Sequence, residues 1–353
     1  MKPSHAASSP LASGETNRLS EAAIRPSELM EEQARLFAED TARLIDKRPD
    51  FIEVSCPACS SDNRCIAFEK TGMPFVTCTH CETLFASPRP RPEHLADYYR
   101  NAQHYTYWSE MIFPASEVAR RENVFRPRVR LLQALCQRFA IPNRILMEVG
   151  AGFGIFCEEI QQSGLFERVI AVEPTPNLAQ DCRKRGLEVI ESPIEQVERQ
   201  HLLSGSQQID VIVSFEVIEH LFSPRDFIQQ CADLLESGGV LMLSCPNGKG
   251  FDIEILGQKS VAIDVEHINL FNPASLSSLL ERCGFDVIDC RTPGQLDAEL
   301  VRNAMLAGDL DPAAHPFLRR VLLDDWEKSG HAFQQFIADN GLSSHMLLTA
   351  RKR

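Results

Sequence analysis

The stretch MEVGAGFG, residues 147–154, decides the fold of the main part of the chain. A short apolar strand is predicted at 145–149, and it runs into three glycines at alternate positions before a helix that extends through Gln162. Glycines at such a junction let backbone amides approach a ligand at the N-terminus of a helix. A dinucleotide-binding loop needs its third glycine at the place of Ile155, so the spacing disfavours a pyrophosphate cofactor.

The sequence beyond this stretch alternates between apolar runs and helical patterns. Such alternation predicts a mostly parallel sheet covered by helices on both faces, which is an α/β, Rossmann-like fold. The last apolar run, 345–350, is expected to be the final strand. Further strands are predicted at 169–172, 189–190, 211–215, 240–244 and 285–290, and helices at 176–185, 224–235 and 273–283.

Two acidic residues stand next to the expected ligand. Glu148 precedes the first glycine, where a carboxylate would repel a pyrophosphate but suits a ligand that carries an ammonium group. Glu173 ends the second strand, where an acid can accept hydrogen bonds from both ribose hydroxyls of an adenosine. The loop 191–194 is expected to reach the adenine. These positions all lie at the carboxyl ends of parallel strands, where open α/β sheets bind ligands.

Four of the twelve cysteines form a metal-ligand pattern. Cys56 and Cys59 make one Cys-x-x-Cys pair, and Cys78 and Cys81 make a second pair after eighteen intervening residues. Each pair directs two thiolates to one point, so the two pairs complete the tetrahedron that Zn²⁺ prefers. A closed shell of four thiolates predicts a structural zinc ion, and a dithiol redox pair is the alternative.

Composition and charge exclude several classes of binding partner. The 353 residues carry a formal net charge of −13, which argues against a protein that follows nucleic-acid phosphates. The basic run 120–130 is expected to be a solvated helix face. No apolar run is long enough to span a bilayer, and the N-terminus lacks the apolar core of a signal peptide. We therefore expect a cytoplasmic protein with neither a membrane nor a nucleic acid as partner.

Changes in composition divide the chain into segments. The motif SPRPRP, residues 87–92, is expected to be a stiff linker because proline fixes φ and removes a hydrogen-bond donor. Five aromatic residues follow between 98 and 108, either to pack the connector onto the main domain or to form a lid over a ligand. The expected segments are a disordered tail at 1–25, a helix at 26–50, a zinc-binding module at 51–90, a helical connector at 91–140, and the main domain at 141–353 with a helical insertion at 292–342.

Five successive motifs resemble those of class I S-adenosylmethionine (SAM)-dependent methyltransferases. They are MEVGAGFG, AVEPTP, VIVSFEVIEHLFSP, LLESGGVLMLSCPN and EHINLFNPASLSSLLERCGF. The resemblance covers about 144–291, and SHMLLTARKR is similar to the antiparallel final strand of that fold. The zinc unit with the following LFASPRPRPEHLADYY resembles the N-terminal module of bacterial methyltransferases of sugar and surface-polysaccharide biosynthesis.

The resemblance implies SAM as the cofactor and assigns the residues that bind it. Gly150, Gly152 and Gly154 would shape the SAM loop, and Glu173 would hold the ribose. The third strand ends in Glu191-Ser192 rather than the common Asp-Ala, so the adenine contact departs from the family pattern. Ser192, Pro193 and Ile194 would flank the adenine, and Phe215 would line the methionine end.

The sequence after the fourth strand, Glu216-Val-Ile-Glu219-His220, supplies the candidate chemistry together with His267. If a helix has begun at residue 216, then Glu216, Glu219 and His220 share one face. The two carboxylates and two imidazoles would suit Mg²⁺ or Mn²⁺, an arrangement that resembles metal-dependent O-methyltransferases. Alternatively, His267 or His220 acts without a metal as a base or substrate anchor, or is structural. As a base, His267 is expected to be a neutral imidazole of ordinary pKa.

The predicted function is methyl transfer from SAM to a small polar acceptor, such as a nucleotide-linked sugar, a glycan or a related metabolite. In-line displacement at a sulfonium mainly requires that the acceptor be aligned. The alternative is a non-catalytic scaffold that binds a partner through its zinc unit. The insertion 292–342 is expected to cover the substrate side, with Asp297, Glu299 and Arg302 as polar candidates, or else to be a packing appendage.

Overall fold

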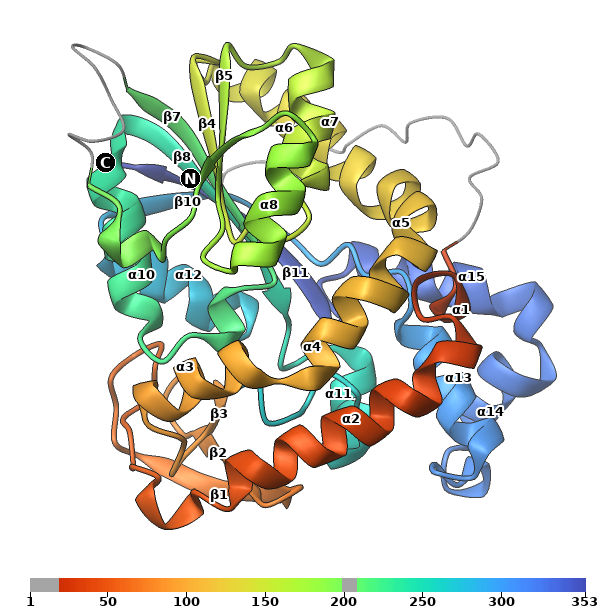
Figure 1. The fold of residues 1–353 in the computed structure, drawn as a ribbon. Helices are drawn as coiled ribbons and strands as arrows, with labels where there is room; N and C mark the ends of the chain where they lie inside the picture. The colour runs from red at the N-terminus through yellow and green to blue at the C-terminus, as the bar shows by residue number, and fades with distance from the viewer. Residues whose placement is uncertain (1–18, 199–207) are drawn as a thin grey trace, which may run out of the picture.

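The structure of the protein is a computed structural model that describes residues 19–198 and 208–353. Its centre is a seven-stranded sheet (Figure 1). Six of the strands run in one direction, whereas the last one in the chain is antiparallel to both of its neighbours, and this confirms the predicted fold class. In order across the sheet they are β10 (Phe285–Arg291), β11 (His345–Lys352), β8 (Leu235–Pro246), β7 (Ile209–Phe215), β4 (Ile145–Val149), β5 (Arg168–Val172) and β6 (Glu188–Ile190).

Alternate residues of the central strands pack into two apolar cores, one on each face of the sheet. Ile145 and Met147 of β4 lie in one core, and Leu146 lies in the other. Every residue of β4 and β7 is buried, as expected for parallel strands that are covered on both faces. The covering helices are α10 (Pro224–Leu234) and α12 (Pro273–Arg282) in the first core, and α6 (Arg126–Phe139), α7 (Ile155–Ser163) and α8 (Pro176–Lys184) in the second.

The cysteine-bearing segment is continuous with the main domain. Its three strands form an antiparallel sheet that is completed by a two-residue strand directly after the His267 loop. Val76 and Phe85 of the segment also lie in the first apolar core. The module predicted at 51–90 therefore shares both hydrogen bonds and core with the main domain. In order across the small sheet, the strands are β1 (Arg64–Lys70), β2 (Met73–Cys78), β3 (Leu84–Ala86) and β9 (Asn269–Leu270).

The helices that precede the first strand of the main sheet in the chain lie alongside the main domain (Figure 1). α2 (Ser27–Ile45) lies within the helix predicted at 26–50. Part of the tail predicted at 1–25 is helical, because Ser20 caps the short helix α1 (Glu21–Ile24); residues 1–18 lie outside the described residues. The connector contains α3 (Pro92–Asn101), α4 (Gln103–Tyr107), α5 (Phe113–Arg120) and α6, with the π-helical turns η2 (Trp108–Ile112) and η3 (Arg121–Phe125).

The segment 292–342 contains three helices and two short helical turns. Its first helix packs against α11 (Phe251–Leu256), and its apolar residues form a cluster of their own. The helices are α13 (Asp297–Ala307), α14 (Pro316–Arg319) and α15 (Trp326–Asp339). The remaining short turns are η1 (Arg48–Asp50), η4 (Ile194–Gln196), η5 (Ile218–His220), η6 (Gly257–Lys259), η7 (Pro312–Ala314) and η8 (Arg320–Asp324).

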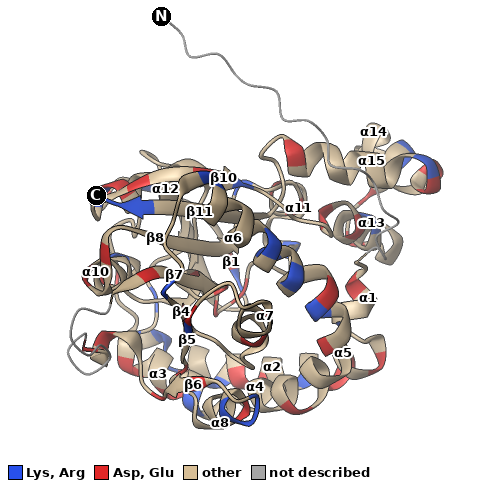
Figure 2. Ribbon diagram, turned by 90° about the horizontal axis from the view of Figure 1, so that it is seen from above, with Lys and Arg blue, Asp and Glu red and all other residues tan. Residues whose placement is uncertain are grey.

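Acidic and basic residues are interspersed over the helices, as Figure 2 shows. The basic run 120–130 forms the solvated face that the sequence predicts only in part, because Arg130 is exposed whereas other members make contacts within the fold. Arg120 donates to the carbonyl of Ile24, and Arg121 and Arg126 pair with glutamates. Within 19–198 and 208–353, no helix combines the length and apolarity needed to cross a membrane.

Candidate cofactor and acceptor site

The glycine loop between β4 and α7 has the backbone geometry that a closely bound cofactor requires. Gly150, Gly152 and Gly154 have positive φ values of 75°, 56° and 72°. A β-carbon at Gly150 would lie 2.5 Å from Val217, and one at Gly154 would lie 2.6 Å from Leu187, so neither position accepts a side chain. A β-carbon at Gly152 would meet no atom within 4 Å. Gly152 therefore faces open space, from which a ligand can approach the backbone.

Two buried carboxyl groups flank this loop. Glu173 is 4% exposed, and its carboxylate accepts the N–H groups of Gly152 at 2.8 Å and Thr175 at 2.9 Å. Its oxygens keep further lone pairs with which to accept ribose hydroxyls. Glu148 is also buried, its Oε2 has no hydrogen-bond partner, and burial raises its pKa to about 8. A buried carboxyl oxygen without a partner fits a site that receives a cationic group.

The residues predicted for the adenine and methionine ends occupy the neighbouring strand ends. After β6, Ser192 is half-buried, Pro193 is exposed and Ile194 is buried. Phe215 ends β7, and the guanidinium of Arg128 lies 4.4 Å from the centre of its ring. Arg128 comes from α6, and no local sequence signal connects it with β7.

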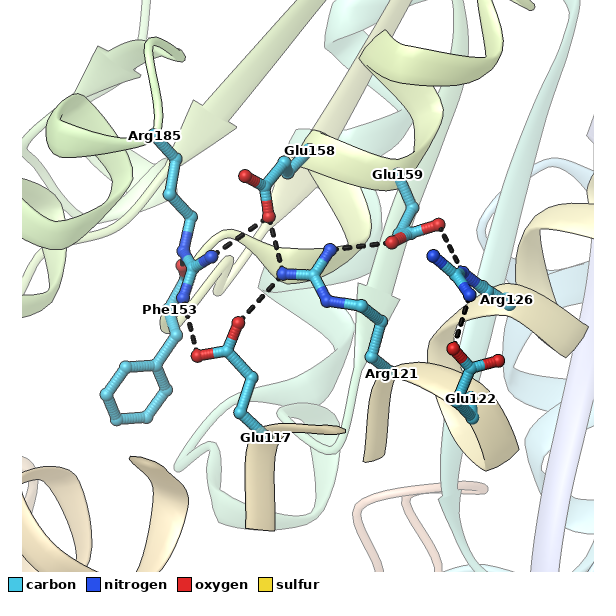
Figure 3. Close-up of polar contacts among 8 residues, drawn as sticks. All are labelled: Glu117, Arg121, Glu122, Arg126, Phe153, Glu158, Glu159 and Arg185. Carbon is cyan, nitrogen blue, oxygen red and sulfur yellow. Dashed lines mark hydrogen bonds and ion pairs between the residues drawn. The ribbon is translucent and has the colours of Figure 1, made fainter. Parts of the chain in front are cut away.

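An ion-pair network holds the connector against the cofactor loop (Figure 3). Arg121 pairs with two glutamates of α7 at 2.6 Å each. Arg185, which shares one of these glutamates, donates from Nε to the carbonyl of Phe153 at 2.8 Å. The ring of Phe153 stacks on Phe113 of α5, with centroids 3.7 Å apart. The connector thus contacts the glycine loop directly.

Glu216 is separated from the other candidate metal ligands. Its φ is +56°, so no helix begins there, and the shared helical face considered from the sequence does not form. Its carboxylate instead accepts a hydrogen bond from Ser244 at 2.5 Å and lies 3.5 Å from both Arg128 and His345. Burial raises the pKa of Glu216, but His345 and Arg128 lower it by more, so the group is a carboxylate.

Glu219, His220 and His267 come together. One ligand atom of each lies within 4.8 Å of the other two, and the two imidazole centroids are 4.7 Å apart. Glu219 is completely buried, and neither of its carboxylate oxygens has a hydrogen-bond partner. A buried carboxylate without a partner is strongly unfavourable unless a proton or a cation neutralises it. Two imidazole nitrogens and one carboxylate oxygen therefore fit a divalent metal ion.

The two imidazoles of this cluster differ in charge. His267 Nδ1 lies 3.0 Å from the carbonyl oxygen of Ala262 and 3.2 Å from Asp264 Oδ2. Burial lowers the pKa of His267, but Asp264 raises it by more, to about 10. Burial and the neighbouring His267 lower the pKa of His220 to about 4. The neutral imidazole at pH 7 is therefore His220, and the ordinary pKa expected for His267 is not found because the loop brings Asp264 against it.

The tyrosines of the connector reach the same cluster. The hydroxyl of Tyr99 lies 3.2 Å from His220 Nδ1. Tyr98 and Tyr105 donate to the carboxylate of Glu266 at 2.7 and 3.0 Å, and Glu266 directly precedes His267. The aromatic residues thus pack onto the main domain at the candidate acceptor site, where their hydroxyl groups contact its residues.

A buried histidine links this site to the N-terminal helix α2. His104 Nδ1 lies 2.6 Å from Asp40 of α2, and its Nε2 lies 2.6 Å from Glu266. Burial lowers the pKa of His104, but Glu266 and Asp40 raise it by more. An imidazolium between two carboxylates therefore connects α2 with the loop that carries His267. Nothing in the local sequence pairs residues so far apart in the chain.

The four predicted zinc ligands converge as expected. Their sulfur atoms all lie within 4.8 Å of one another, and two pairs are 3.5 Å apart. Tetrahedral zinc with Zn–S bonds of about 2.3 Å places sulfur atoms about 3.8 Å apart. The two Cys-x-x-Cys turns also repeat one backbone pattern, because Ser60 donates to the carbonyl of Cys56 and Glu82 to that of Cys78. The cysteines that fit the ion are Cys56, Cys59, Cys78 and Cys81.

The polar candidates of the insertion are used within the fold. Asp297 is buried and accepts a hydrogen bond from Ser343 at 2.8 Å. Glu299 accepts the backbone N–H of Glu21 at 3.2 Å, and the guanidinium of Arg302 lies 4.9 Å from the centre of the Trp326 ring. These contacts turn the three side chains toward α1, β11 and the insertion itself, which favours the packing appendage.

The sheet order, the glycine loop and the acid at the end of β5 define the class of fold as that of class I methyltransferases. Residues 120–289 match the sequence model of a family described as a methyltransferase domain. This part of the chain is therefore a methyltransferase domain, as its motifs predict.

Several named proteins resemble the chain over part of its length. A "Probable S-adenosylmethionine-dependent methyltransferase" from Mycolicibacterium smegmatis is 30% identical over 165 residues, which are 47% of this chain and 60% of that protein. A Mycobacterium tuberculosis protein of similar description is 32% identical over 161 residues, 45% of this chain and 56% of that protein. A ubiquinone biosynthesis O-methyltransferase from Dinoroseobacter shibae is 25% identical over 155 residues, covering 41% and 60%.

The chain spans 56–60% of the length of these relatives. Among solved structures, a 1,6-didemethyltoxoflavin-N1-methyltransferase from Burkholderia thailandensis aligns with a TM-score of 0.44 at 16% identity, covering 78% of this chain and 97% of that one. The domain match and the names of the relatives support the prediction of an enzyme.

Proposed function

We propose that the chain is a SAM-dependent methyltransferase that acts on a small polar acceptor. The observation that carries this proposal is the arrangement of two half-sites along one edge of the sheet. The glycine loop and Glu173 lie at the ends of β4 and β5, and the cluster of Glu219 and His220 follows the adjacent strand β7. A cofactor and an acceptor bound at these places would meet at the carboxyl ends of the parallel strands.

In the proposed reaction, a nucleophilic atom of the acceptor attacks the methyl carbon of SAM in line. The new bond to the methyl group forms as the carbon–sulfur bond breaks, its electron pair goes to sulfur, and the acceptor loses a proton to a base. The protein mainly binds and aligns the two reactants. Imidazole, carboxylate and tyrosine groups beside the cofactor edge suit a hydroxylated acceptor such as a nucleotide-linked sugar, a glycan or a related metabolite.

The acceptor side is best explained by a divalent ion, Mg²⁺ or Mn²⁺, at Glu219, His220 and His267. Without an ion, Asp264 raises the pKa of His267 to about 10, which disfavours a free base; a bound divalent ion would take the place of the proton on Nε2. Its Nδ1 contacts leave Nε2 as the ligand atom, which is the usual orientation of a metal-binding histidine. Such an ion would act as a Lewis acid toward an acceptor oxygen. Glu216 does not belong to this ligand set.

The cysteine site would hold a structural zinc ion, because four thiolates leave no position for a substrate. A non-catalytic scaffold is disfavoured by two features that scaffolding does not need. These are the backbone geometry of the glycine loop and the buried, unpartnered carboxylate of Glu219.

Calorimetry with S-adenosylhomocysteine (SAH), the demethylated product of SAM, tests the cofactor, and a folded protein that fails to bind it contradicts the proposal. Mass spectrometry of metabolites from cells with and without the gene then identifies the acceptor by a 14 Da shift. With that acceptor, a chelator should abolish activity and Mn²⁺ or Mg²⁺ should restore it. A chelator-insensitive enzyme in which His267→Ala lowers kcat by about 10²–10⁴ would instead establish His267 as a base.

A further inference from the structure

Arg89, within the linker 87–92, is a cation in an unusual place. It is 3% exposed, and burial lowers its pKa to about 10. Among the residues that the structure describes, no carboxylate lies within ion-pair distance of its guanidinium. Removing a charge from water is unfavourable unless the group is paired or fully used in hydrogen bonds. The contacts that Arg89 does make therefore indicate what it does in the fold.

Those contacts join the small sheet to the turn after β7. Nη1 of Arg89 donates to Oδ1 of Asn269 at 2.8 Å, and Nη2 donates to the carbonyl of Phe222 at 2.7 Å. The guanidinium also lies 4.7 Å from the centre of the Phe222 ring. A planar guanidinium can make both hydrogen bonds and the ring contact at once, which the point charge of a lysine cannot.

Asn269 passes this contact on to the residues of the candidate acceptor site. It is completely buried, and its Nδ2 lies 3.4, 3.3 and 2.7 Å from the carbonyl oxygens of Ile218, Glu219 and Leu221. Arg89 has only donors, so it fixes the amide of Asn269 with its oxygen toward the guanidinium and its NH₂ group toward the turn. The turn held in this way carries Glu219 and His220.

We propose that Arg89 is a positioning residue for the acceptor side of the site, acting through Asn269 on the turn that presents Glu219 and His220. This inference rests on the proposed function and deepens it, because it gives the segment that follows the cysteine site a role in the reaction. Displacement of a reacting group by 1 Å lowers a rate by about 10²-fold. The glycine loop and Glu173 make no contact with Arg89, so cofactor binding should be independent of it.

The test compares Arg89→Met with Arg91→Met in the full chain. Arg91 is exposed, comes from the same linker and contacts only the carbonyl of Asp50, so it is a matched control. The readouts are the imidazole nitrogen NMR signals of His220, assigned with His220→Gln, and SAH affinity by calorimetry. Arg89→Met should move the His220 signals and leave the Kd of SAH within twofold, whereas Arg91→Met should change neither. With an identified acceptor, kcat should fall by about 10–10²-fold at unchanged KM for SAM.

Unchanged His220 signals in folded Arg89→Met would overturn the inference. An equal loss of SAH affinity would also overturn it, because Arg89 would then support the whole domain. If Arg89→Met does not fold, Asn269→Asp decides: it still accepts from Arg89 but cannot donate to the turn, so wild-type His220 signals would exclude the role. Failure of the wild type to bind SAH would refute only the proposed function, since the His220 spectrum requires no cofactor.

Discussion

The proposed cofactor side and the proposed acceptor side lie on one sheet edge but are built differently. The cofactor side is made by two short stretches, the glycine loop and the end of β5, whose backbone and carboxylates already face one another. The acceptor side is assembled from the turn after β7, the loop before β9 and the tyrosines of the connector. Arg89 and His104 lie much earlier in the chain than this turn and this loop and hold them through long-range contacts.

In the proposed site, the cysteine-bearing segment and α2 contact the acceptor side, whereas the later part of the connector contacts the glycine loop. β3 pairs with β9 two residues after His267, and α2 reaches the same loop through His104. A cofactor site can be encoded locally because strand, glycine loop and helix are consecutive in the chain. Residues that recognise an acceptor come from variable connections, and their positions must then be fixed by contacts over long sequence distances.

The largest effect is expected from Cys59→Ser. Loss of one thiolate should release the zinc, whose binding contributes about 10–16 kcal/mol in small zinc-folded units. Metal analysis should then find no zinc, and hydrogen exchange should increase in residues 51–90 and in β9, which belongs to the same sheet. SAH affinity should fall less than acceptor turnover. Cys65→Ser, an exposed position on β1, is the control, and full zinc content in Cys59→Ser would contradict the site.

His104→Ala should give the next largest effect. It leaves the buried Glu266 without its cation and Asp40 with only the more exposed Arg43, and removal of one member of a buried ion pair costs about 3–5 kcal/mol. The folded-state pKa of His104 is raised, so its charge stabilises the fold fully below its ordinary pKa of about 6.5. That contribution is lost as the pH rises through the folded-state pKa.

Urea unfolding of wild type and His104→Ala at pH 6 and pH 9 checks this prediction. The difference in the free energy of unfolding should be larger at pH 6. His331→Ala, an exposed position on α15, should change stability little at either pH. A difference that is equal at both pH values would show that His104 carries no charge in the folded protein.

Glu173→Ala tests the cofactor side directly. A hydrogen bond to a charged group contributes about 1.5–3 kcal/mol, so SAH affinity should fall by about 10–150-fold. The His220 signals should stay unchanged, because Glu173 contacts only the loop residues Gly152 and Thr175. Glu188→Ala, an exposed position on β6 that pairs with Arg168, is the control. Wild-type SAH affinity in Glu173→Ala would place the ribose elsewhere.

Much of the fold follows from features that are local in the sequence. The apolar runs of β4 and β7 predict buried parallel strands, and the glycines predict a loop whose backbone a ligand can approach, which the positive φ values fit. The two cysteine pairs likewise predict their convergence, because each pair sets its own turn. These predictions succeed since the interactions that determine them lie within a few residues or repeat along one element.

The acceptor side could be predicted only in part. Glu219, His220 and His267 are all singled out by the sequence and do come together. The place of Glu216 depends on a positive φ at a residue other than glycine, which sequence periodicity does not reveal. The protonation of His267 depends on how the loop folds Asp264 onto it. The roles of Arg89 and Asn269 depend on contacts over 180 residues, for which the chain gives no local signal.

The smallest effect is expected from Arg121→Met, which asks whether the cofactor side also depends on a distant segment. Arg121 is 18% exposed in its side chain and joins the connector to two glutamates of α7 beside the glycine loop (Figure 3). Ion pairs near the surface contribute about 0.2–1 kcal/mol, so SAH affinity should fall by about fivefold at most. The difference from wild type should shrink at high salt, because salt screens exposed charges.

The exposed Arg130→Met is the control for removing a positive charge from the same connector. Calorimetry at low and high salt separates the possible outcomes. A fall in affinity at low salt for Arg121→Met alone would show that the connector supports the cofactor loop through these ion pairs. Equal affinity of all three proteins at low salt would show that the stacking of Phe113 on Phe153 suffices. The cofactor side would then be held by its local contacts and this one stack, and dependence on distant charged residues would be confined to the acceptor side.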